Sequence, residues 1–205
     1  MLNRKVCILD YGSGNVASVK NSFERIGIKC LISNESTDIQ DSSHLVLPGV
    51  GAFKTSMEKI ERMLPLNLIR EQVSIGKPFL GICVGLQVLA ERGFEFGYHS
   101  GLNILSGTEV VELPDVVSKP HVGWNSIEIV NNHPILTNID NGADFYFVHS
   151  YFLSKIDHIN ILAVCKYGIS FPAIVAKNNV IGVQFHPEKS QNNGDELLKN
   201  FFELV

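Results

Sequence analysis

The fold is decided by the stretch Pro78-Phe79-Leu80-Gly81-Ile82-Cys83-Val84-Gly85-Leu86-Gln87. Its apolar run at 79–82 is typical of a central strand buried on both faces. The apolar spacing over residues 84–91 predicts a helix, which Gly93 can end. Cys83 then lies where strand turns into helix, with a glycine two residues away on each side.

This Gly-x-Cys-x-Gly spacing has the form of a nucleophile elbow with cysteine in place of serine. A strained turn needs small neighbours, and Gly81 and Gly85 remove the side chains that would clash there. The helix start brings backbone N–H groups and the positive end of its dipole near the sulfur, and both favour the thiolate. The alternative interpretation is a structural cysteine buried beside a glycine turn, since free cysteines are often core residues.

Composition places the chain among soluble globular proteins. Its 205 residues predict a single domain spanning 1–205, with 45% hydrophobic and 19% charged residues. The net charge of −4 gives no indication of nucleic acid or of an acidic membrane surface as partner. No apolar stretch is long enough to cross a bilayer, and the N-terminus shows no signal-peptide pattern.

The four cysteines are scattered without C-x-x-C spacing, at positions Cys7, Cys30, Cys83 and Cys165. This pattern argues against a zinc site and against a disulfide framework. We therefore expect no metal, no cofactor and a reducing, cytoplasmic location. Cys7 falls inside an apolar run and is expected to be a core residue.

The first half alternates strands with helices. Strands are predicted at 6–9, 29–32, 45–47 and 79–82, and helices at 16–26, 54–63 and 65–75. This alternation indicates an α/β fold with a doubly wound, mainly parallel sheet and helices on both faces. Ligands of such sheets sit beyond the carboxyl ends of the strands, which is where Val50, Gly51 and Cys83 fall. The Gly12-Ser13-Gly14 turn lacks the third glycine of a dinucleotide site and favours a simple tight turn.

The second half changes character. Strands are predicted at 108–113, 125–130, 145–148, 173–177 and 180–185, joined by turns without helices. We expect them to extend the sheet in an antiparallel manner. Asn178-Asn179 fits a hairpin turn, and residues 195–204 predict a final amphipathic helix.

Gln184-Phe185-His186-Pro187-Glu188 is the second informative stretch, because it ends a predicted strand. His186 and Glu188 are separated only by a rigid proline, so the carboxylate can hold the imidazole in one tautomer. Alone, such a motif is usually a surface turn. Together with the cysteine elbow it forms a Cys83–His186–Glu188 set of nucleophile, base and orienting group.

These motifs resemble those of the class I glutamine amidotransferases, which carry a G-x-C-x-G elbow and a terminal H-P-E. Five stretches over almost the whole chain are similar to the glutaminase subunits of imidazole glycerol phosphate synthase: residues 10–15, 48–51, 121–125, 147–151 and 184–190. The resemblance implies that Cys83 attacks the side-chain amide of glutamine and forms a thioester. It implies that His186 protonates the departing ammonia and then activates water, while Glu188 orients His186.

The resemblance also implies an oxyanion hole and a substrate site. The backbone N–H of Val84 and one near Val50-Gly51 would form the oxyanion hole. Substrate-binding positions are carried over to Gln87, Glu95, His149, Ser150 and Tyr151. Glu95 suits the α-ammonium of glutamine by charge. The plainer alternatives are a solvated helix position for Gln87, a surface loop charge for Glu95, and a strand end with satisfied polar groups for His149 and Tyr151.

Ammonia released into water would be protonated and lost as a nucleophile. The family solves this by docking on a barrel-shaped synthase subunit as a heterodimer, and the resemblance places Asn15, Trp124, Asn125 and Lys189 at that interface. Trp124, expected in a strand-end turn, fits a core as well as an interface. The two glycines of 48–51 permit a peptide flip, so we expect the isolated chain to be a poor glutaminase that its partner switches on.

Two departures from the family pattern keep the ammonia acceptor open. The usual Leu and Met after the nucleophile are Val84 and Leu86, which are apolar replacements that leave the chemistry intact. Residues 93–102 resemble a paralogous branch that supplies ammonia to a sugar-modifying synthase in surface-polysaccharide biosynthesis. Two other classes are a stand-alone cysteine hydrolase on a similar sheet, such as a peptidase or deglycase, and a non-catalytic interaction subunit. The glutamine-site matches argue against the first, and the intact triad argues against the second.

Overall fold

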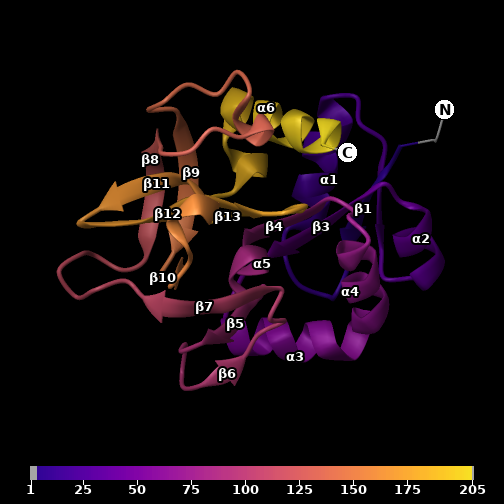
Figure 1. Cartoon of the computed structure of the whole chain (residues 1–205), viewed down its shortest axis with the longest axis horizontal. Coiled ribbons are helices and arrows are strands. Elements are labelled where there is room, and N and C mark those ends of the chain that lie inside the picture. Colours follow the sequence, from indigo (N-terminus) through magenta and orange to yellow (C-terminus); the bar gives the residue numbers. More distant parts are fainter. Residues whose placement is uncertain (1–3, 205) are drawn as a thin grey trace.

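The computed structural model describes residues 4–204. A nine-stranded sheet of order β2-β1-β3-β4-β13-β12-β11-β8-β9 runs through the molecule (Figure 1). Its strands are β1 (Val6–Leu9), β2 (Cys30–Ser33), β3 (His44–Gly49), β4 (Phe79–Cys83), β8 (His121–Ile129), β9 (Asp144–His149), β11 (Ile161–Tyr167), β12 (Ile169–Lys177) and β13 (Val180–Val183). The helices are α1 (Val16–Arg25), α2 (Ser36–Asp41), α3 (Phe53–Met63), α4 (Leu66–Ser74), α5 (Val84–Gln87) and α6 (Gln191–Glu203).

The main sheet has a parallel half and an antiparallel half. Strands β2, β1, β3, β4 and β13 pair in parallel, and β12, β11, β8 and β9 continue the sheet in antiparallel pairing. Helices α1 and α6 cover one face of the parallel half, and α3 and α4 lie on the other (Figure 1). This confirms the predicted doubly wound α/β sheet with an antiparallel extension.

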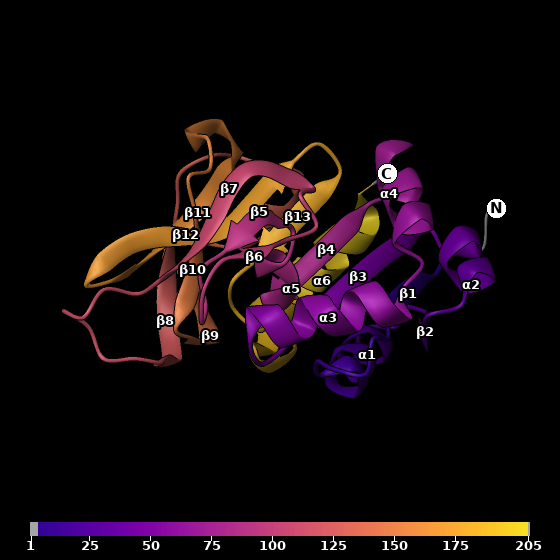
Figure 2. The same ribbon diagram turned by 90° about the horizontal axis from the view of Figure 1, so that it is seen from below.

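A second sheet of four strands was not foreseen. It has the order β10-β7-β5-β6 and consists of β5 (Ala90–Gly93), β6 (His99–Ser100), β7 (Leu105–Glu112) and β10 (Tyr151–Ser154). It lies against the antiparallel half, on the same side of the main sheet as α3 (Figure 2). The strand predicted at 108–113 is therefore real but belongs to this second sheet, which corrects its assignment to the central one.

The helix predicted over residues 84–91 is wrong in its second half. Helix α5 ends at Gln87, and the chain continues into β5. Backbone N–H groups of residues 101, 102, 103 and 105 donate to the carbonyls of residues 91, 88, 90 and 89. These long-range bonds, together with the pairing of β5 with β6 and β7, hold residues 90–93 in extended structure, so tertiary contacts override the local apolar spacing.

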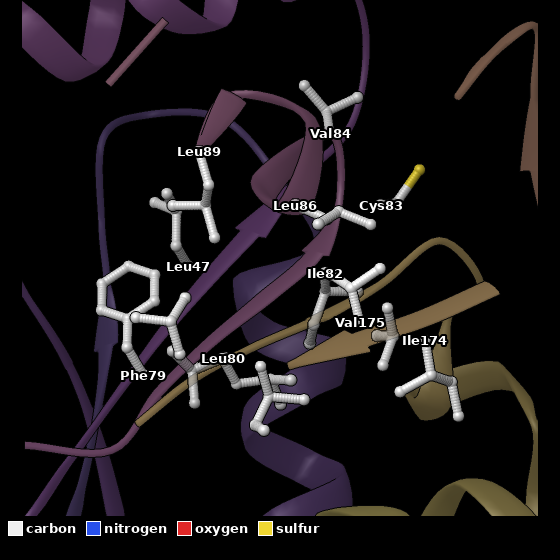
Figure 3. Packing of buried hydrophobic residues seen from close by; sticks show 14 of the residues in the cluster. Leu47, Phe79, Leu80, Ile82, Cys83, Val84, Leu86, Leu89, Ile174 and Val175 are labelled. Carbon is white, nitrogen blue, oxygen red and sulfur yellow. The ribbon is translucent and has the colours of Figure 1, made fainter. Parts of the chain in front are cut away.

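The parallel strands and α5 share one buried hydrophobic core. Every residue of β1, β3, β4 and β13 is buried. Figure 3 shows Leu47, Leu80, Ile82 and Leu86 as members of one buried cluster around the elbow, while the sulfur of Cys83 points away from the apolar side chains. None of the helices within residues 4–204 combines the length and apolar character needed to cross a membrane.

Candidate active site

Cys83 occupies a strained turn at the carboxyl end of β4. Its φ of 53° and ψ of −111° lie where non-glycine residues are rarely found. A Cβ on Gly81 would lie 2.8 Å from the carbonyl oxygen of Gly85, and one on Gly85 would lie 1.8 Å from that of Leu47. The two glycines therefore allow α5 to turn back against β3 and β4, as the elbow motif predicts.

His186 and Glu188 reach the cysteine from the neighbouring strand. Strand β13 pairs with β4 in parallel register, with Val183 opposite Ile82, so the segment after β13 arrives beside Cys83. Nδ1 of His186 donates to Oε1 of Glu188 at 2.8 Å, and both side chains are almost fully buried. Because Nδ1 is engaged as a donor, Nε2 is the atom left to exchange a proton with substrate or sulfur.

The charge state of His186 is set by its two neighbours. Burial alone would lower the pKa of His186. The Cys83 and Glu188 side chains beside it have the opposite effect, which outweighs burial and raises the pKa to about 10. Nε2 makes no hydrogen bond of good geometry with any residue in 4–204, so it has no protein partner that would compete with substrate. A raised pKa keeps the imidazole protonated at neutral pH, which is the form that can donate a proton to departing ammonia.

A cavity of about 370 Å³ opens over the cysteine. This size falls within the range of small-ligand pockets. Its lining brings together most of the site residues expected from the sequence: Val50, Gly51, Cys83, Val84, Gln87, Glu95, His149, Ser150, Tyr151, His186 and Lys189. Pro120 and Val148 also line it and were not predicted as site residues, although Pro120 directly precedes the 121–125 motif and Val148 lies within the 147–151 motif.

Glu95 connects the cavity to the segment that carries Val50. Its Oε2 accepts a hydrogen bond of 2.6 Å from the backbone N–H of Phe53, the first residue of α3. Glu95 is thus an N-terminal cap of that helix as well as a carboxylate in the cavity lining. This half-buried position differs from the freely exposed loop charge that was the plainer alternative.

A family model described as "Glutamine amidotransferase class-I" matches residues 7–205. The chain belongs to the class-I glutamine amidotransferase family. A Geobacter sulfurreducens protein named "Imidazole glycerol phosphate synthase subunit HisH" is 40% identical, with 98% of this chain and 99% of the relative covered. A Pseudomonas aeruginosa protein named "Imidazole glycerol phosphate synthase subunit HisH 2" is 44% identical, with 98% and 100% covered.

Solved structures show the same fold at low sequence identity. The chain described as "Crystal structure of glutamine amidotransferase" is similar with a TM-score of 0.76 at 19% identity, with 97% of both chains covered. "Structure of PurLQS from Thermotoga maritima" gives a TM-score of 0.75 at 18% identity, again covering 97% of both chains. Both confirm that the two sheets and their helices form a class-I glutamine amidotransferase fold.

In this glutamine amidotransferase, the segment 48–51 is held firmly at one end only. The Tyr11 hydroxyl donates to the Pro48 carbonyl at 2.9 Å, and a Cβ on Gly49 would lie 2.4 Å from the backbone nitrogen of Gly85. Val50 is 40% exposed, and its carbonyl accepts only a long 3.4 Å bond from the Ser13 hydroxyl. Restraint therefore decreases towards Gly51, whose φ is 94°.

A chain of hydrogen bonds through His149 and His121 supports the cavity wall that residues 148–151 form. Nδ1 of His149 lies 2.9 Å from the carbonyl of Tyr151, which can only accept, so Nδ1 carries the proton. Nε2 of His149 then accepts from Nδ1 of His121 at 3.0 Å, and Nε2 of His121 accepts from the Asn125 amide at 3.2 Å. Sequence reasoning quoted His121 within the 121–125 motif but assigned it no role.

Burial keeps this histidine pair neutral. Burial is the main reason that the pKa of His149 is lowered to about 4, and it outweighs the hydrogen bond to the Tyr151 carbonyl, which raises this pKa. Burial also lowers the pKa of His121. Both ring nitrogens of His149 are thus satisfied within the protein, as the plainer alternative for this residue anticipated. The ring supports the wall that Ser150 and Tyr151 present to the cavity.

Of the residues expected at a partner interface, Lys189 lines the cavity, Trp124 lies near Lys189, and Asn15 contacts the triad. Trp124 is 47% exposed and sits inside β8, not in the strand-end turn expected from the sequence. It packs edge-on against Tyr146, over whose ring the Lys189 ammonium lies at 5.6 Å. The Asn15 amide donates to Oε1 of Glu188 at 3.4 Å, which connects it directly to the triad.

Proposed function

We propose that this chain is the glutaminase subunit of an imidazole glycerol phosphate synthase, acting in histidine biosynthesis. One observation carries the proposal: a strained, nucleophilic cysteine shares a cavity with a Glu188-bound histidine and a carboxylate, Glu95. The names of relatives that are 40% and 44% identical over nearly the whole chain support the same conclusion.

Glutamine hydrolysis proceeds in two steps. The Cys83 thiolate attacks the side-chain carbonyl carbon of glutamine, a C–S bond forms, and the C–N bond breaks as His186 gives its proton to the departing ammonia. Neutral His186 then takes a proton from water, whose oxygen attacks the thioester. The C–S bond breaks, glutamate leaves, and the thiolate and imidazolium are restored.

The backbone and the cavity wall serve the developing charges. The N–H groups of Val84 and Val50 stabilise the oxyanion of each tetrahedral intermediate. Glu95 binds the α-ammonium of glutamine through the carboxylate oxygen that does not cap α3. Residues Gln87, His149, Ser150 and Tyr151 shape the remaining surface.

The partner is a barrel-shaped synthase subunit that forms a heterodimer with this chain. Trp124, Asn125, Asn15 and Lys189 contact it, and ammonia passes through the interface to a phosphorylated ribulosyl aminoimidazole carboxamide intermediate. The products are imidazole glycerol phosphate and an aminoimidazole carboxamide ribotide. A Val50 N–H turned away from the oxyanion lowers turnover by about 10²–10³-fold until the partner docks.

The test compares two nitrogen sources in the assembled complex. The chain is mixed with the histidine-pathway barrel subunit and its ribulosyl acceptor, and imidazole glycerol phosphate is measured with glutamine or with ammonium salt. We expect wild type to use both and Cys83→Ala to use ammonium only, because the barrel subunit remains intact. Failure of glutamine to support the reaction, with ammonium still active, would overturn the proposal and direct the search to a sugar acceptor.

A further inference from the structure

We propose that Gln184 is a further catalytic residue, whose side-chain amide donates an N–H to the sulfur of Cys83 and favours the thiolate. Gln87 acts as the positioning residue that fixes the orientation of this amide. The inference rests on the proposed function of Cys83 as the glutaminase nucleophile. It assigns a role to Gln184, which the sequence motif contains but the triad does not use.

The sheet itself holds Gln184 against the nucleophile. Gln184 directly follows β13, whose Val183 pairs with Ile82, so the residue is carried alongside Cys83. Its backbone N–H donates to the carbonyl of Ala173 at 2.9 Å, and its exposed fraction is 0%. Nε2 of Gln184 lies 3.7 Å from the sulfur, within hydrogen-bond reach of a large sulfur atom.

The orientation of the Gln184 amide follows from the backbone carbonyl of Tyr151, to which it is connected through the Gln87 amide. The Tyr151 carbonyl can only accept, and an amide group of Gln87 lies 2.7 Å from it, so that group is the nitrogen. The same nitrogen lies 3.2 Å from Gln184, which must therefore present its oxygen. The remaining end of the Gln184 amide, its N–H, then faces the sulfur.

The reverse orientation is doubly unfavourable. It would place the nitrogens of Gln87 and Gln184 face to face and turn a carbonyl oxygen towards Cys83. Buried polar groups without a partner carry a large desolvation cost, so the observed orientation is strongly preferred. The amide of Gln184 is thus a donor of defined direction, set before substrate binds.

A hydrogen-bond donor beside the Cys83 sulfur would offset the repulsion between a thiolate and the Val148 carbonyl oxygen. The Val148 carbonyl oxygen lies 3.8 Å from the sulfur, an arrangement that suits the neutral S–H and repels a thiolate. The amide N–H of Gln184 and the imidazolium of His186 offset that repulsion. Gln184 takes up no proton; it stabilises sulfur as an anion before attack on glutamine and again when the thioester C–S bond breaks.

The experiment measures the sulfur directly. Iodoacetamide alkylates thiolates and needs no glutamine site, so its rate with Cys83, followed by peptide mass spectrometry from pH 5 to 10, reports the thiolate fraction. Gln184→Met keeps a similar volume and removes the donor. We expect alkylation of Cys83 to slow about tenfold at pH 7 and its profile to move to higher pH. Gln184→Glu, which turns an acceptor towards the sulfur, should slow it further.

Two controls separate this role from a structural one. Gln72→Met changes another buried glutamine, on α4, and should leave the profile unchanged. If Gln184→Met fails to fold, Gln87→Leu carries the test, because it frees the Gln184 amide to turn and should slow alkylation roughly threefold. A folded Gln184→Met with the wild-type profile, or an equal change in Gln72→Met, would overturn the inference.

The same variants distinguish this inference from the proposed function. In the first case, the wild-type complex hydrolyses glutamine and Gln184→Met has the same turnover and the same alkylation profile. That result would refute the role of Gln184 and leave the proposed function standing. In the second case, the wild-type complex does not hydrolyse glutamine, but Gln184→Met still moves the alkylation profile of Cys83. That result would refute the proposed function and support the contact between the Gln184 amide and the sulfur.

Discussion

The parallel and antiparallel halves of the main sheet build opposite sides of one cavity by different means. The parallel half supplies Cys83 from a turn fixed by backbone packing, in which Gly81 and Gly85 leave no room for a Cβ. The antiparallel half supplies His149, at the end of β9, which is fixed by side-chain hydrogen bonds to His121 and to the Tyr151 carbonyl at the start of the second sheet. The nucleophile thus depends on the absence of side chains, and the wall depends on the polarity of side chains.

Strand β13 joins the two halves and brings the base to the nucleophile. It pairs with β4 on one side in parallel and with β12 on the other in antiparallel register. Gln184 and His186 follow it and face Cys83 from this junction. We therefore expect catalysis to require both halves of the sheet in register.

The largest effect is expected at the junction. His186→Ala removes the proton carrier and should lower glutamine turnover by at least about 10³-fold in the partner complex. Glu188→Gln keeps an oxygen that can accept from Nδ1 and should lower turnover by only about 10–10²-fold. Turnover by each purified complex checks the order, and a silent Glu188→Gln beside an inactive His186→Ala would mean that another group orients the imidazole.

The next effect tests backbone packing in the parallel half. Gly85→Ala drives a Cβ into the Leu47 carbonyl and should lower the free energy of unfolding by about 3 kcal/mol or more. Gly107→Ala, in the second sheet, has open space but a φ of 83° and should cost only about 1–2 kcal/mol. Urea unfolding of both variants measures the difference, and equal costs would show that close packing does not fix the elbow.

The parallel half was the more predictable one, and the reason is physical. Its strands are buried at every residue and are separated by helices, so continuous apolar runs mark them in the sequence. The elbow glycines and the His-Pro-Glu motif are local signals, so Cys83, His186 and Glu188 could be predicted from the sequence. The structure brings the three residues together because β13 pairs with β4. Their catalytic roles remain predictions.

The antiparallel half and the second sheet carried weaker signals. No sequence pattern predicts β6, β10 or β11, and the helix predicted over residues 84–91 overlaps the start of β5. The backbone partners of β5 lie in residues 99–110, which no local pattern reveals. The contact of Gln184 with Cys83 and the hydrogen bond between His121 and His149 join residues 101 and 28 positions apart. Such contacts depend on strand register, which the sequence specifies only through the whole fold.

The smallest effect concerns acid and tests the polar wall. Burial gives folded His149 a pKa of about 4 against an ordinary 6.5, so the unfolded chain binds more protons between these values. The free energy of unfolding therefore falls as pH drops through this window, by about 2–3 kcal/mol for this one group. His44 in the parallel half, whose pKa burial also lowers to about 4, adds a separate share.

Substitution separates these shares. His149→Gln should reduce the loss of stability between pH 7 and pH 4.5, measured by urea unfolding, by about 2 kcal/mol or more. The exposed His158 provides the matched control, and His158→Gln should keep the wild-type pH dependence. An unchanged pH dependence in His149→Gln would show that the wall does not require a neutral histidine.

The most direct test of the account is the site of covalent labelling by a glutamine analogue that alkylates thiols. Burial raises the pKa of Cys7 and of Cys165 to about 12 and also raises that of Cys30, so these three remain thiols at neutral pH. We expect label on Cys83 alone in the partner complex, slowed by added glutamine and accompanied by loss of glutaminase activity. Label spread evenly over the four cysteines, or label on Cys83 that glutamine does not slow, would contradict it.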